Sequence, residues 1–166
     1  MLSAKLIEQL NALGLDPNNV ENVVKAAIAE DLAGGSDVTS ISTIPENQVA
    51  IAEFVARKAG VVAGLNIVGA VLESEGITDY EILVSEGSHI DAGRTILRAH
   101  GNTRKLLLVE RTALNFLGRL SGISTLTDRW VSEVRGTNAK IRDTRKTTPL
   151  LREFEKFAVR AGGGVN

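Results

Sequence analysis

The sequence of 166 residues contains no cysteine, only two histidines and only 4% aromatic residues. Without cysteine the chain cannot form disulfides, thiolate zinc sites or a cysteine nucleophile, and two histidines do not make a histidine-rich metal site. So few aromatic residues leave no stacking platform of the kind that binds single-stranded nucleic acid. The sequence therefore predicts no metal ligands of its own and no nucleic-acid partner.

Long apolar runs are also missing. No stretch of about 18 apolar residues occurs, which predicts that no helix spans a membrane. The first ten residues have the spacing of an amphipathic helix and not of a secretory signal, so we expect a cytoplasmic protein. Hydrophobic residues make up 43% of the chain and charged residues 23%, the proportions of a folded globular protein.

Charge is unevenly distributed, although the formal net charge is only −1. The span 129–160 holds nine basic and four acidic residues, whereas the remainder holds ten basic and sixteen acidic residues. Such segregation favours an anionic ligand for the C-terminal part of the chain. A solvated basic helix face would give the same count.

Apolar periodicity in the first hundred residues predicts a mixture of helices and strands. We expect helices over 2–13, from Pro17 onward and over 65–74, a polar glycine-rich loop over 30–40, and strands over 48–58, 80–85 and 95–99. This mixture indicates an α+β domain.

The pattern changes after Gly101. Residues 102–134 read as helix with a break near 120–122, followed by a short strand over 139–143. Thr148 and Pro149 then supply an N-cap and a first-turn proline, which predict the start of another helix. We expect a boundary near 101–110, where an α+β domain gives way to the beginning of an alternating α/β region.

The densest group of reactive side chains is Asp143-Thr144-Arg145-Lys146-Thr147-Thr148-Pro149, between the expected strand and helix. Ligands bind at this edge in α/β folds, and helix N-termini favour anions. Arg145 offers a planar fork for carboxylate or phosphate, Lys146 a point charge and Thr147 a hydroxyl. The segment therefore fits a multiply charged anion, or else a helix cap preceded by two solvated cations.

Arg111 is a second candidate, because it is flanked by Leu107, Leu108 and Leu114 at helical spacing. A partly buried arginine needs a partner, and the adjacent Glu110 points to another side of the helix. Either a distant acid pairs with Arg111 or the side chain serves a ligand. Acidic residues in the 30–40 loop could bind a cation, but helix capping is the simpler interpretation of them.

Four segments together resemble one known family. They are Glu110-Arg111-Thr112-Ala113-Leu114-Asn115-Phe116, Leu120-Ser121-Gly122-Ile123, the Asp143–Pro149 segment, and Lys156-Phe157-Ala158-Val159-Arg160-Ala161-Gly162-Gly163-Gly164. In this order and at these separations they resemble quinolinate phosphoribosyltransferase. The loop from Glu30 to Ser40 is similar to that family's N-terminal loop as well.

The resemblance implies an α+β N-terminal open-faced sandwich followed by the start of an α/β barrel, with most barrel strands outside this sequence. We expect the sandwich over 1–109, and linker helices with the first strand–helix unit over 110–166. It also implies a homodimer. The implied reaction joins quinolinate to phosphoribosyl pyrophosphate, which brings Mg²⁺, and releases pyrophosphate and CO₂ to give nicotinate mononucleotide for NAD biosynthesis.

By motif position, the resemblance makes Arg145, Lys146 and Thr147 quinolinate-binding residues and sends Arg111 into the site of the partner subunit. That role would explain why no mate for Arg111 is evident in its own sequence. The family continues beyond its glycine motif with further ligands for ribose and Mg²⁺, whereas this sequence ends at Asn166. We therefore expect the chain to be a fragment that is inactive alone, with Leu150, Phe154 and Phe157 lacking packing partners.

Two other functions stay open at this point. A phosphoribosyltransferase-like protein of molybdenum metabolism shares the Asp-Thr-Arg-Lys-Thr motif. The turn over 85–93 resembles that of a lipoyl- or biotinyl-type carrier, but such carriers need a lysine at the hairpin tip, and no lysine lies between Lys58 and Lys105.

Overall fold

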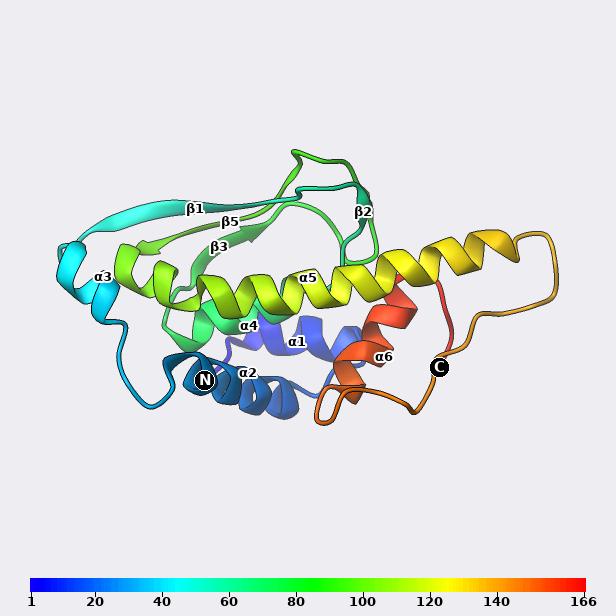
Figure 1. Cartoon of the computed structure of the whole chain (residues 1–166), viewed down its shortest axis with the longest axis horizontal. Coiled ribbons are helices and arrows are strands. Elements are labelled where there is room, and N and C mark those ends of the chain that lie inside the picture. Colours follow the sequence, from blue (N-terminus) through cyan, green and yellow to red (C-terminus); the bar gives the residue numbers. More distant parts are fainter.

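The computed structural model describes residues 1–166 and contains six helices and five strands (Figure 1). Three antiparallel strands form the main sheet in the order β1-β5-β3, and β2 pairs with β4 in a small second sheet. The strands are β1 (Val49–Val55), β2 (Gly60–Val61), β3 (Asp79–Ile82), β4 (His89–Ile90) and β5 (Thr95–Asn102).

One helix, α5, runs along almost the whole molecule. Figure 1 shows the main sheet along one side of α5 and the N-terminal helices along the other, with α6 packed near its C-terminal half. The helices are α1 (Ala4–Ala12), α2 (Pro17–Leu32), α3 (Val38–Thr43), α4 (Leu65–Ser74), α5 (Thr103–Glu133) and α6 (Arg152–Ala161). The α+β class predicted from the sequence is confirmed.

Side-chain oxygens cap the starts of most helices, as their sequences predict. Asp16 accepts a hydrogen bond from the Asn18 amide at 3.0 Å, with Pro17 in the first turn of α2. Helix α4 begins after Gly64, which has no side chain to offer, and Glu86 from a distant loop takes its place. Its carboxylate accepts from the amides of Gly64 at 2.8 Å and Asn66 at 3.0 Å.

The core is a single cluster of 29 buried residues that extends from α1 to α6. Phe154 is 0% exposed and Phe157 is 3% exposed, and the Phe154 ring stacks on Phe116 with centroids 5.7 Å apart. The expectation that these two rings would lack partners is therefore wrong, because α6 folds back onto α5. Leu150, by contrast, is 87% exposed. Leu126 and Trp130 on α5 are also each more than half exposed.

Several predicted elements differ in extent. The glycine-rich segment 30–40 is only partly loop, since α2 continues to Leu32 and α3 starts at Val38. Helix α5 shows no break at 120–122, because intrahelical hydrogen bonding continues through Gly122. The strand expected over 139–143 is reduced to one parallel bridge between Arg142 and Val165.

The last helix starts three residues later than the sequence predicts. Leu151 donates its amide to the Thr148 carbonyl at 3.1 Å, which closes a turn with Pro149 second and Leu150 third. Leu150 has φ +67°, so the backbone is not helical there, and α6 begins at Arg152. The division into 1–109 and 110–166, which falls inside α5, stays a prediction.

Candidate functional site

The segment that carries Arg145, Lys146 and Thr147 lies on the surface just before α6. The side chains of Arg145 and Lys146 are exposed and make no hydrogen bond or ion pair within the chain. Thr147 accepts a hydrogen bond from Arg152 Nε at 3.1 Å. Two cations without internal partners are therefore free to meet an anion.

Neighbouring cations are engaged, which sets Arg145 and Lys146 apart. Lys156 on α6 pairs with Asp143, whose side chain is only 8% exposed, and Asn166 also donates to that carboxylate at 3.2 Å. Arg160 donates to the Leu13 carbonyl at 2.6 Å. The Asp143 bonds attach the start of the segment to α6, and the Arg160 bond attaches α6 to the end of α1, while the two central cations of the segment stay unpaired.

A second network holds the segment against α5. Arg119 on α5 pairs with Glu155 on α6 and donates to the Thr148 hydroxyl, and the Thr148 amide donates to Glu155 Oε2 at 3.2 Å. Burial raises the pKa of Glu155, but hydrogen bonds from Arg119 and Thr148 outweigh burial and hold the pKa below its ordinary value. Sequence reasoning missed Arg119 and Glu155, because nothing in a sequence pairs residues 36 positions apart.

The glycines at the end of α6 serve helix packing. A Cβ atom on Gly162 would overlap the Ser124 carbonyl oxygen of α5 and lie 2.8 Å from the Thr127 side chain. The glycine lets the C-terminus of α6 approach the α5 backbone closely. It thereby fixes the position of α6 and of the segment that precedes it.

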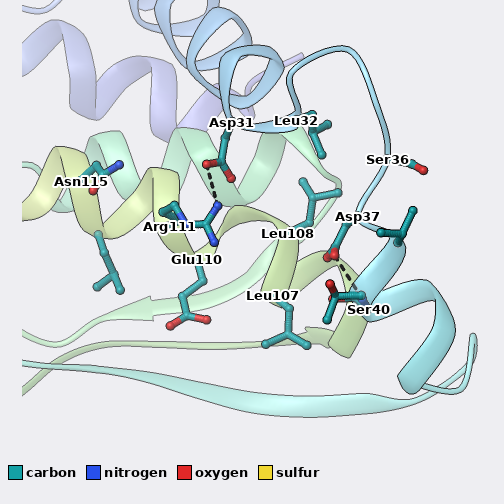
Figure 2. Close-up of a pocket in the computed structure, with 13 residues that line it drawn as sticks. Asp31, Leu32, Ser36, Asp37, Ser40, Leu107, Leu108, Glu110, Arg111 and Asn115 are labelled. Carbon is teal, nitrogen blue, oxygen red and sulfur yellow. Dashed lines mark hydrogen bonds and ion pairs between the residues drawn. The ribbon is translucent and has the colours of Figure 1, made fainter.

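Arg111 lies in a different pocket, of about 690 Å³, formed by the end of α2, the start of α3 and one face of α5 (Figure 2). Its Nη1 donates to Asp31 Oδ1 at 2.9 Å. A distant acid of the same chain therefore pairs with Arg111, which is one of the two alternatives that the sequence left open. This hydrogen bond, together with the charge of Asp31, raises the pKa of the Arg111 guanidinium, so the side chain stays protonated.

The structure does not bring Arg111 together with Arg145, Lys146 or Thr147, none of which lines this pocket. An adjacent groove of about 800 Å³ lies between α2, α5 and residues 148–151, and it shares Asp31 and Asn115 with the Arg111 pocket. The two groups of candidate residues thus lie in separate places, and the groove connects the Arg111 pocket with the residues that follow Thr147.

Two of the three carboxylates of the 30–40 segment, those of Asp31 and Asp37, have partners within the chain. Asp37 caps α3 through the Ser40 amide at 3.1 Å, and this hydrogen bonding lowers the pKa of Asp37. No three histidine, aspartate or glutamate side chains gather as metal ligands do. None of the helices combines the length and apolar character that crossing a membrane requires.

Two family models match the chain. The N-terminal domain model of quinolinate phosphoribosyl transferase matches residues 37–121, and the C-terminal domain model of the same family matches residues 123–166. The first match contains Arg111, and the second contains the Arg145–Thr147 segment. Three of the four motifs on which the resemblance was based each lie within one match, and the fourth, residues 120–123, spans the junction between the two.

Known proteins agree with these models. The chain is 44% identical over 148 residues to nicotinate-nucleotide pyrophosphorylase [carboxylating] of Mycobacterium leprae, covering 87% of this chain and 52% of that protein. The chloroplastic protein of the same name from Arabidopsis thaliana is 36% identical over 149 residues, covering 89% of this chain and 42% of that protein.

Solved structures extend the agreement to the fold. NadC from Streptococcus pyogenes superimposes with a TM-score of 0.87 at 37% identity, covering 92% of this chain and 54% of that one. For the nicotinate-nucleotide pyrophosphorylase of Francisella tularensis the TM-score is 0.83 at 33% identity, covering 90% of this chain and 53% of that one. The chain thus spans about half the length of the relatives it matches. It belongs to the quinolinate phosphoribosyltransferase family.

Proposed function

We propose that this chain supplies the quinolinate-binding part of a quinolinate phosphoribosyltransferase. The reaction transfers the phosphoribosyl group of phosphoribosyl pyrophosphate to quinolinate, with release of pyrophosphate and CO₂, and gives nicotinate mononucleotide for NAD biosynthesis. Family membership supports this reaction. The observation that carries the proposal is the exposed, unpaired state of Arg145 and Lys146 at the family's motif.

Each binding residue has a role that its chemistry suits. Arg145 holds one carboxylate of quinolinate through its planar fork, Lys146 neutralises charge, and Thr147 donates from its hydroxyl. Orientation of the pyridine ring brings its nitrogen toward the ribose anomeric carbon, so positioning and charge neutralisation are the main catalytic contributions of these residues. The network of Arg119, Glu155 and Thr148 keeps the segment in place.

Arg111 acts in the site of a second subunit in this proposal. Arg145 and Lys146 do not line the pocket that holds Arg111, and this supports a homodimer in which each chain contributes Arg111 to the site of the other. In this proposal Mg²⁺ enters with the phosphoribosyl pyrophosphate substrate, whose phosphate oxygens it prefers as ligands. A cytoplasmic location stays a prediction.

Quinolinate binding tests the proposal directly. We expect isothermal titration to show that the chain binds quinolinate more tightly than nicotinate, which lacks the second carboxylate. Arg145→Gln should weaken quinolinate binding by about tenfold or more, because a charge-assisted hydrogen bond is lost. Lys140→Gln, which removes a nearby exposed cation outside the motif, is the matched control and should leave the affinity unchanged.

Equal affinity for quinolinate and nicotinate would contradict the proposal, as would equal losses in the two variants. An assay with magnesium phosphoribosyl pyrophosphate measures turnover separately. We expect no nicotinate mononucleotide from the purified chain alone, and product formation would overturn that expectation while supporting the reaction. Neither the molybdenum-metabolism protein nor the carrier module is supported by the comparisons.

A further inference from the structure

Asp31 occupies a place in its helix that needs a compensating cation. The last turn of α2 contains Glu30 and Asp31 but no basic residue. The carbonyl end of a helix carries partial negative charge, so carboxylates there are unfavourable unless a cation offsets them. Arg111, 80 residues further along the chain, supplies that cation from α5.

The Arg111–Asp31 contact engages only a small part of the hydrogen-bonding capacity of the guanidinium. A guanidinium carries five N–H donors, and the contact at 2.9 Å engages Nη1 alone. Nε and Nη2 make no hydrogen bond within the chain. The Arg111 side chain is 73% exposed, whereas the Asp31 side chain is only 27% exposed. The carboxylate is therefore the more buried partner, and the free edge of the guanidinium faces solvent.

The pocket itself repels anions. Asp31, Asp37 and Glu110 all line it, against the single positive charge of Arg111 (Figure 2). Figure 2 shows Asp31 meeting Arg111, while Asp37 is engaged with Ser40. A dicarboxylate therefore meets the guanidinium on its outward edge and does not enter among these carboxylates.

From this geometry we propose that Asp31 is a positioning residue for Arg111. It anchors Nη1, and it thereby directs the free Nε–Nη2 edge toward a carboxylate presented by another subunit. The inference rests on the proposed function, because the ligand carboxylate belongs to quinolinate. Asp31 itself touches no substrate and acts only through Arg111.

Titration of quinolinate into the chain and its variants tests this role. We expect Asp31→Ala to weaken the affinity by about tenfold, because an unanchored arginine is misplaced by an ångström or more. Asp31→Asn keeps a hydrogen-bond acceptor for Nη1, so it should lose less affinity for quinolinate than Asp31→Ala. Glu110→Ala is the matched control: it removes a carboxylate from the same pocket without touching Arg111, and its affinity should equal or exceed that of the parent.

A double-mutant cycle separates positioning from simple charge. On an Arg111→Lys background, Asp31→Ala should have no further effect. An Asp31→Ala chain that binds quinolinate as well as or better than the parent overturns the positioning role, provided that Arg111→Lys alone weakens binding. If Arg111→Lys binds like the parent, or if the parent does not bind quinolinate, the proposed function fails together with this inference. Circular dichroism of each variant establishes that it is folded.

Discussion

The Glu73 carboxylate on α4 accepts two hydrogen bonds from Ser3, one from its amide at 2.6 Å and one from its hydroxyl at 2.7 Å. Ser3 is also the N-cap of α1, since its hydroxyl accepts from the Leu6 amide. Tyr80 on β3 donates to the same carboxylate at 3.0 Å. Burial, and then the charge of Glu73, raise the pKa of the Tyr80 hydroxyl. One buried carboxylate thus connects α1, α4 and β3.

Glu73→Gln should therefore destabilise the protein by about 1–3 kcal/mol, since a buried charge-assisted acceptor with three donors becomes an amide that can accept only through one atom. Urea unfolding measures this loss. Glu8→Gln, at an exposed position of α1, is the control and should change the free energy of unfolding by less than about 0.5 kcal/mol. Similar changes in the two variants would contradict the role assigned to Glu73.

The helix α4 illustrates what can be predicted from sequence. Its bounds, 65–74, match the periodic apolar run, because local periodicity and a following glycine define it. Its cap could not be predicted, since Glu86 comes from a loop about twenty residues away. The same holds for the candidate site: Arg145 and Lys146 were identifiable from their motif, but Asp31 as the partner of Arg111 required the fold that brings α2 against α5.

The Glu155 network predicts a dependence of stability on acid. The folded-state pKa of Glu155 lies below its ordinary value of 4.5, so its ionised form stabilises the folded state. This contribution is present above pH 4.5 and is lost as the pH falls through the lowered pKa. Glu155→Gln should be less stable than the parent at pH 7, and the difference should shrink on acidification below that range.

Urea unfolding of the parent and of Glu155→Gln at a series of pH values measures the effect, because the other carboxylates titrate in both proteins. If the free energies of unfolding of the two proteins changed with pH in parallel, the ionised form of Glu155 would not be stabilised by Arg119 and Thr148. Arg119→Gln should give the same convergence at low pH, since it removes the main cationic partner of that carboxylate.

Substitution by alanine at two glycines of packed helices should change the stability of the protein in opposite directions. Gly162→Ala places a methyl group on the Ser124 carbonyl and should destabilise by about 1–3 kcal/mol, as overpacking does. Gly118 lies inside α5 with open space around it, so Gly118→Ala should stabilise by about 0.5–1 kcal/mol through helix propensity. Thermal unfolding of the two variants and the parent measures both changes in stability. A stabilised Gly162→Ala variant would mean that α6 does not approach α5 this closely.

Leu150 combines a strained backbone with a side chain that buries almost nothing. It is third in the Thr148–Leu151 turn with φ +67°, a conformation in which glycine carries no steric penalty, and it is 87% exposed. Leu150→Gly should raise the free energy of unfolding by up to about 1 kcal/mol, because relief of the left-handed strain exceeds the added chain entropy of glycine. Leu150→Ala keeps the strain and removes only exposed atoms, so it should match the parent. If Leu150→Ala is destabilised instead, the leucine side chain packs against something in solution, and unfolding at several protein concentrations would show whether that surface is a second copy of the chain.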